Sequence, residues 1–154
     1  MSSELIKIVL VVEYEGTNYC GFQFQDNVKT VQDEIEKALF KLTAEKLRVI
    51  SASRTDTGVH ARGQVVSYWT FSRLASERIL NGLNYYLPLD IAVQAVYKVN
   101  SRFNVQKDVV SREYRYLIWN SWTRSPLQRA HTHQVGSALD IQAMNRACEL
   151  LLGE

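Results

Sequence analysis

Cysteine and proline are scarce in this sequence, which has two residues of each and seven glycines among 154. Cys20 and Cys148 lie far apart, and neither belongs to a Cys-x-x-Cys pair. This spacing argues against a disulfide scaffold and against a thiolate metal site. His131 and His133 form a His-x-His, but no carboxylate or cysteine lies close in the sequence to complete a ligand set. We therefore expect two free thiols and assign no metal.

Long hydrophobic runs are also missing. The longest purely aliphatic run is residues 8–12, far below the ~20 residues that cross a bilayer. The N-terminus has no basic flank before an apolar stretch of the kind that signal peptides carry, so we expect a cytoplasmic protein with no membrane contact. No repeat and no Gly/Ser/Pro linker divides the chain. Because a chain of this length buries about 70% of its unfolded surface, we predict one core.

The charge is nearly balanced overall but unevenly distributed. The net charge is +2, yet residues 51–130 carry 11 basic and 5 acidic groups, a local charge of +6. Nine of those basic groups are arginines, whose planar forks of donors suit phosphate groups. The segment therefore favours an anionic partner, and a solvated arginine-rich face remains the alternative.

Hydrophobic periodicity predicts elements in the order βαββαββα. The predicted strands are residues 5–14, 47–52, 64–71, 91–99 and 110–119; the predicted helices are residues 31–45, capped by Thr30, residues 76–85, and a last helix capped by Asp140 and stopped by Gly153. This order indicates an α+β fold, a ferredoxin-like layer in which a mainly antiparallel sheet carries helices on one face. The other sheet face would be open to a ligand or partner. The apolar last helix predicts a hydrophobic patch that favours self-association.

The segment from Ser53 to Gly63 carries the most chemistry. It places Asp56 in a polar connection between two predicted strands, with Arg54, His60 and Arg62 within six residues. Cations close to a carboxylate keep it ionised, as a nucleophile must be. The alternative is a structural turn, because Asp and Gly favour turns for local reasons.

Asp56-Thr57-Gly58 also matches the signature of aspartic proteases. Those enzymes use two carboxylates that share one proton, and their triplet follows an apolar strand end. Here Arg54 precedes the triplet and would hold the aspartate ionised, which opposes the shared-proton state. The pattern therefore disfavours a protease.

Residues 54–61 (Arg-Thr-Asp-Thr-Gly-Val-His-Ala) resemble the Gly-Arg-Thr-Asp-Ala-Gly-Val-His-Ala motif of the tRNA pseudouridine synthase A (TruA) family. Other stretches agree with that family in the same order. They are residues 13–16 (Glu-Tyr-Glu-Gly), 21–25 (Gly-Phe-Gln-Phe-Gln), 30–32 (Thr-Val-Gln), 87–91 (Leu-Pro-Leu-Asp-Ile) and 112–116 (Arg-Glu-Tyr-Arg-Tyr). The resemblance covers nearly the whole chain.

The resemblance implies isomerisation of uridine to pseudouridine in the anticodon stem-loop of tRNA, at positions 38, 39 and 40, without a cofactor. It implies that Asp56 is the nucleophile, that Tyr114 stacks on the target uracil, and that Arg54 helps to displace the flipped base. Further RNA contacts are expected from Arg62, Arg112, Arg115, Gln23 and Gln25. A core position for Tyr114 and structural roles for Gln23 and Gln25 remain alternatives. Because members of this family form homodimers, the resemblance also implies a homodimer.

The sequence departs from the family pattern in three places and in length. Ser53 and Thr57 replace the usual Gly and Ala, and residues 103–106 lack the usual Ala-Arg. Family members continue into a second half of similar architecture, so residues 1–154 correspond to the N-terminal, nucleophile-bearing domain, and we expect little or no turnover from them alone. The alternative is a non-catalytic α+β RNA-binding module in which Asp56 only shapes a turn.

Overall fold

The computed structural model describes residues 4–153 and divides the chain into two compact units, Met1–Ser111 and Arg112–Glu154. The described residues still form one hydrophobic core, as predicted. Within the described residues, every buried hydrophobic side chain lies between Ile6 and Val105, so the second unit adds nothing to the core. Among residues 4–153, no helix is both long enough and apolar enough to cross a bilayer.

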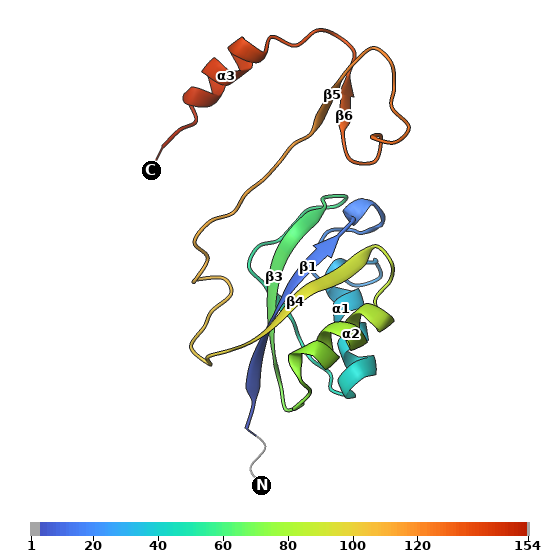
Figure 1. Cartoon of the computed structure of the whole chain (residues 1–154), viewed down its shortest axis with the longest axis vertical. Helices are drawn as coiled ribbons and strands as arrows, with labels where there is room; N and C mark the ends of the chain where they lie inside the picture. Colours follow the sequence, from blue (N-terminus) through green and yellow to red (C-terminus); the bar gives the residue numbers. More distant parts are fainter. Residues whose placement is uncertain (1–3, 154) are drawn as a thin grey trace. The chain divides into compact units, whose positions relative to one another are not determined.

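The first unit contains a four-stranded antiparallel sheet and two α-helices (Figure 1). Its elements are β1 (Ile6–Tyr14), the 3-10 helix η1 (Gly16–Asn18), α1 (Val31–Thr43), β2 (Ile50–Ser51), β3 (Ala61–Thr70), α2 (Ser76–Tyr86) and β4 (Ile91–Val99). The strand order across the sheet is β2-β3-β1-β4, and all neighbours are antiparallel. This is the split βαβ arrangement of a ferredoxin-like layer, so the predicted fold class is confirmed.

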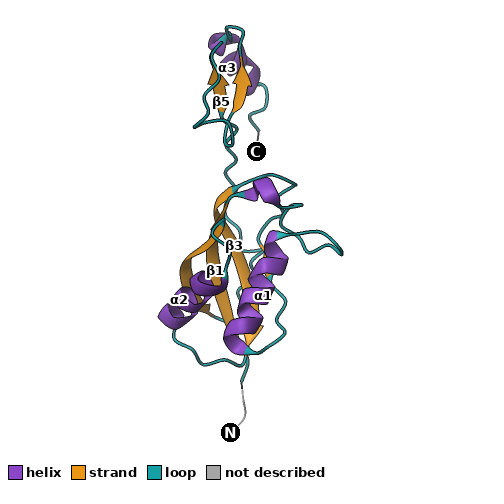
Figure 2. Cartoon of the chain, turned by 90° about the vertical axis from the view of Figure 1, so that its right-hand side faces the viewer, coloured by secondary structure: helices purple, strands orange, loops and turns teal. Residues whose placement is uncertain are grey.

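Both helices lie on one face of the sheet (Figure 2). Each helix connects two strands that run parallel with one strand between them, and right-handed crossovers place both helices on the same side. The core lies between the layers. It combines alternate residues of β1 (Ile6, Ile8, Leu10, Val12 and Tyr14) with Val31, Ile35, Ala38 and Leu39 of α1 and Ile79 and Leu83 of α2.

Most element boundaries in this unit agree with the sequence pattern. The hydroxyl of Thr30 accepts a hydrogen bond from the Asp33 amide at 3.3 Å, and α1 ends at Thr43, followed by Ala44 as its C-cap with a left-handed φ of 58°. β3 begins three residues before the predicted start, at Ala61. β2 keeps only Ile50 and Ser51 of the predicted residues 47–52, which leaves a long connection before β3.

The sheet face opposite the helices is partly open, as predicted. Lys7, Val9 and Val11 of β1 point to it, and by register Lys7 stands between Trp69 and Val99. The Lys7 ammonium lies 4.9 Å from the centre of the Trp69 ring. Tyr97 on the same face is 56% exposed. This face therefore keeps accessible aromatic rings.

The second unit differs from the prediction. Residues 110–117 form no strand; β5 (Ile118–Asn120) is short and pairs in parallel with β6 (His133–Val135), which the sequence did not predict. The alternating aromatic residues matched a strand pattern, but a strand needs a partner for its backbone groups, and of residues 110–120 only residues 118–120 have one. The last helix, α3 (Ile141–Glu149), is present as predicted, with the Asp140 carboxylate accepting from the Ala143 amide at 2.9 Å.

Candidate active-site pocket

Asp56 lies in the connection between β2 and β3, at the start of a tight turn. The Val59 amide donates to the Asp56 carbonyl at 3.2 Å, and Gly58 adopts a φ of 78°. A positive φ at the third residue of a four-residue turn is what a type II turn requires, and glycine adopts it without strain. The turn leaves the Asp56 side chain exposed to solvent.

A pocket of about 450 Å³ opens beside this turn. It brings together four residues predicted from the sequence, Arg54, Asp56, Gln23 and Gln25. The other lining residues are Cys20, Gly21, Phe22, Thr55 and Thr57. Among the described residues, Arg54 and Asp56 share this pocket without forming an ion pair. The pocket therefore presents a carboxylate and a guanidinium that are both turned to solvent.

The backbone of residues 16–22 supports the Asp56 loop from one side. The Phe22 amide donates to the Thr55 carbonyl at 3.0 Å, and the Gly58 amide donates to the Tyr19 carbonyl at 3.2 Å. Gly21 has a φ of 82°, and a Cβ there would lie 2.8 Å from the Thr55 carbonyl oxygen. The two segments thus meet backbone to backbone, which the motif residues alone did not reveal.

His60 supports the same contact with its ring. Its Nδ1 accepts a hydrogen bond from the Gly16 amide at 3.0 Å, so that nitrogen carries no proton. The sequence grouped His60 with the cations around Asp56. In the structure its Nδ1 instead holds η1, because the main-chain amide there needs an acceptor.

Tyr19 anchors the supporting segment to the start of β4. Its hydroxyl donates to the Asp90 carboxylate, and the Glu15 amide donates to the Asp90 carbonyl at 2.9 Å. Burial raises the pKa of the Tyr19 phenol, and the hydrogen bond to Asp90 and the charge of Asp90 raise it further. Tyr19 therefore stays a neutral donor at any physiological pH.

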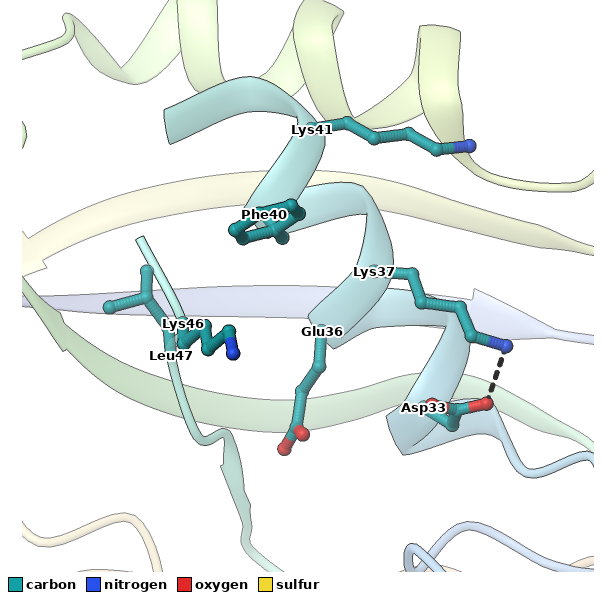
Figure 3. Close-up of a pocket in the computed structure, with 7 residues that line it drawn as sticks. All are labelled: Asp33, Glu36, Lys37, Phe40, Lys41, Lys46 and Leu47. Carbon is teal, nitrogen blue, oxygen red and sulfur yellow. Dashed lines mark ion pairs between the residues drawn. The ribbon is translucent and has the colours of Figure 1, made fainter. Parts of the chain in front are cut away.

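A second hollow, of about 360 Å³, lies along α1 (Figure 3). Its lining residues are Asp33, Glu36, Lys37, Phe40, Lys41, Lys46 and Leu47. Lys37 pairs with Asp33 at 2.6 Å and with Glu34 at 3.2 Å, and hydrogen bonds to these carboxylates raise its pKa. This hollow contains none of the predicted site residues, and its carboxylates pair with Lys37 or Arg48, so we assign it no chemistry.

Comparisons with known proteins show which family the chain belongs to. Residues 10–106 match the family described as tRNA pseudouridine synthase. The chain belongs to this family. It is 44% identical over 146 residues to tRNA pseudouridine synthase A of Francisella tularensis subsp. holarctica, which covers 95% of the chain and 57% of that relative. It is 45% identical to tRNA pseudouridine synthase A of Acetivibrio thermocellus, with 95% of the chain and 60% of the relative covered. The chain thus spans about 60% of the length of these relatives.

As a member of the tRNA pseudouridine synthase family, the chain carries the segment that matches the family, residues 10–106, within its first unit. The matched segment includes the whole pocket and the loop that supports it. Family membership also disfavours the aspartic protease interpretation of Asp56-Thr57-Gly58, because these residues lie within the segment that matches a tRNA pseudouridine synthase.

The remaining predicted residues lie outside the pocket lining. Arg62 is an exposed residue of β3, six positions after Asp56. Arg112, Tyr114 and Arg115 belong to the second unit, where Tyr114 is 71% exposed and Arg115 pairs with Glu113 at 2.6 Å. Within that unit Tyr114 is not a core residue, so the core alternative for this tyrosine is wrong.

Proposed function

We propose that the chain acts, in the cytoplasm, in the isomerisation of uridine to pseudouridine in tRNA, with Asp56 as the nucleophile and no cofactor. The observation that carries this proposal is the exposed Asp56 carboxylate on a tight turn that shares a pocket with Arg54, in a chain that matches the pseudouridine synthase family. A carboxylate held at the mouth of a pocket suits attack on an electrophilic sugar or base.

The reaction sets clear demands on this pocket. The bond from uracil N1 to ribose C1′ breaks, the base turns over, C5 bonds to C1′, and the hydrogen on C5 leaves as a proton. Asp56 can attack the sugar or the base, or take the 2′ proton to give a glycal. In each route the target nucleotide must leave its stack to reach the carboxylate, at a cost of a few kcal/mol.

Exposed residues of both units would supply contacts for such a substrate. We assign the anticodon stem-loop as the target, at positions 38, 39 and 40. Arg54, beside Asp56, would occupy the space that the flipped base leaves, and Tyr114 would offer its ring as a stacking platform, since base stacking on an aromatic ring contributes about 1–3 kcal/mol. The remaining RNA contacts would come from Arg62, Arg112, Arg115, Gln23 and Gln25.

Release of tritium from tRNA labelled at uridine C5 tests this proposal, because that hydrogen is lost only when C5 bonds to the sugar. The assay uses the 154-residue chain in excess over tRNA, so that slow single turnovers are counted. The A. thermocellus relative, 45% identical to the chain, serves as the positive control. We expect slow release by the chain. Salt-sensitive tRNA binding without any release, both by the chain and by the chain fused to the remaining part of the relative, would favour the RNA-binding module instead.

Binding to tRNA is expected to weaken steeply with salt. If Arg62, Arg112 and Arg115 each neutralise one phosphate, affinity should fall about 20- to 40-fold between roughly 50 and 200 mM salt, because each contact releases condensed counterions. Filter binding across that range measures the slope. Arg62→Gln should reduce the slope of log affinity against log salt concentration by nearly one, whereas Arg78→Gln on α2 should leave that slope unchanged. A salt-independent affinity would contradict phosphate recognition.

We also propose that the protein pairs with itself. Ile141, Met144 and Leu151 of the C-terminal segment are exposed in the second unit, and exposed apolar patches of this kind favour association. Sedimentation velocity at rising concentration should therefore show a growing fraction of dimer. A single monomer peak at the highest concentrations would contradict the pairing.

A further inference from the structure

A buried polar pair lies directly behind the Asp56 loop. Tyr14, the last residue of β1, is 3% exposed, and Gln64 of β3 is 6% exposed. The Tyr14 hydroxyl lies 2.7 Å from the Thr55 hydroxyl, and the Gln64 amide donates to the Ser53 carbonyl at 2.8 Å. Gln64 also hydrogen bonds to Tyr14 itself. Two buried side chains, bonded to each other, therefore hold alternate residues of the loop.

The two residues that this pair holds alternate with two exposed, charged residues. Ser53 and Thr55 are half-buried, whereas Arg54 and Asp56 are exposed. Arg54, Thr55 and Asp56 all line the pocket. Fixing Ser53 and Thr55 in the interior leaves the charged side chains only the outer side. The buried pair thus determines which way Arg54 and Asp56 point.

Thr55 is held at both of its oxygen atoms. Its hydroxyl forms a hydrogen bond with the Tyr14 hydroxyl, and its carbonyl accepts a hydrogen bond from the Phe22 amide at 3.0 Å. The rings of Tyr14 and Phe22 pack together with centres 6.1 Å apart, so the two contacts share one support. Burial raises the pKa of the Tyr14 phenol, although its hydrogen bonds to Thr55 and Gln64 act in the opposite direction. The phenol therefore stays protonated and able to donate.

We propose that Tyr14 and Gln64 are positioning residues that hold the Ser53–Thr55 backbone and thereby direct Arg54 and Asp56 into the pocket. The catalytic consequence rests on the proposed function. A displacement of about 1 Å at a reacting group can cost about 100-fold in rate, so a support one residue from the nucleophile acts on kcat and leaves tRNA affinity nearly unchanged.

Tyr14→Phe tests the support without reference to activity. It removes one hydroxyl and keeps the ring that packs on Phe22. Hydrogen exchange at the Phe22 and Gly58 amides, which bond across to the loop and its support, should accelerate about fivefold, the ratio expected from losing one ordinary hydrogen bond. Thr55→Val should give the same acceleration, the double variant should add little to it, and Thr55→Ser, which keeps the hydroxyl, should restore the parent's exchange.

Tyr68→Phe is the matched control. Tyr68 is another buried core tyrosine. Tyr14 pairs with Ala61 of β3, and Tyr68 lies seven residues farther along that strand. Unchanged exchange at Phe22 and Gly58 in Tyr14→Phe would overturn the proposal. So would an equal acceleration in Tyr68→Phe, because that result would indicate general loosening of the core.

Tritium release separates this inference from the proposed function. In single turnovers, Tyr14→Phe should slow release about tenfold at saturating protein, with the concentration dependence for tRNA unchanged, and Tyr68→Phe should match the parent. Faster hydrogen exchange in Tyr14→Phe, with no tritium release even from the parent, would support the positioning role. That result would count only against the proposed isomerase activity. Faster exchange with a parental rate of release would overturn the role of the pair in directing Asp56.

Discussion

Asp56→Asn is expected to abolish tritium release from uridine-labelled tRNA, with a loss of at least about 10⁴-fold in single-turnover rate. The amide has nearly the shape of the carboxylate but can neither attack carbon nor accept the 2′ proton. The turn itself depends on the Asp56 carbonyl, which accepts from the Val59 amide at 3.2 Å, and this main-chain bond survives the substitution. Affinity for tRNA, measured by filter binding, should therefore change little.

Asp26→Asn provides the matched control for the lost charge. Asp26 is also exposed and lies in the segment between η1 and α1, but it does not line the pocket. We expect it to release tritium at the parental rate. Parental release from Asp56→Asn would remove Asp56 as the nucleophile, and tighter tRNA binding by both variants would indicate a general charge effect.

Gly16→Ala is expected to destabilise the first unit strongly. A Cβ at Gly16 would lie 2.0 Å from the Val59 carbonyl oxygen and 2.6 Å from its carbon. Both are backbone atoms, so no side chain can rotate away, and the Asp56 turn must separate from η1. Overpacking of this kind costs about 3 kcal/mol, which corresponds to a fall in Tm of about 10 °C. Differential scanning calorimetry measures the change.

Gly63→Ala is the control for adding a methyl group to a glycine near this loop. The nearest atom to a Cβ at Gly63 would be Cγ1 of Val11, at 3.9 Å, which is ordinary contact. Its unfolding free energy should stay within about 0.5 kcal/mol of the parent. If Gly16→Ala melted at the parental temperature, the close approach of η1 to the Asp56 turn would be refuted.

The first unit followed its sequence pattern because local and tertiary preferences agree there. In β1 alternate residues are apolar and enter one core, and in α1 the apolar stripe begins at a threonine that caps the helix. The second unit did not follow, because an aromatic alternation around Tyr114 and Tyr116 describes a strand only when another strand pairs with it. The pairing of β5 with β6 joins residues 15 positions apart, and no local pattern indicates it.

The site was predictable where the chemistry is local. The motif placed Arg54 and Asp56 together, and the structure adds Gln23 and Gln25 to the same pocket, as the sequence had suggested for RNA contacts. The support of that pocket was not predictable. Tyr14 and Gln64 look like ordinary strand residues in the sequence, and only the register of β1 and β3 places them behind the loop.

The support of the Asp56 turn also bears on how the protein folds. The Gly16 amide and the His60 ring are 44 positions apart, and Tyr19 and Asp90 are 71 apart. Contacts of such long range form only after the intervening chain has been ordered, and they slow folding. We therefore expect the pocket to be assembled late, after α1 and β4 have packed on the sheet. A short peptide carrying the Asp56 motif would have the residues of the site but none of its geometry.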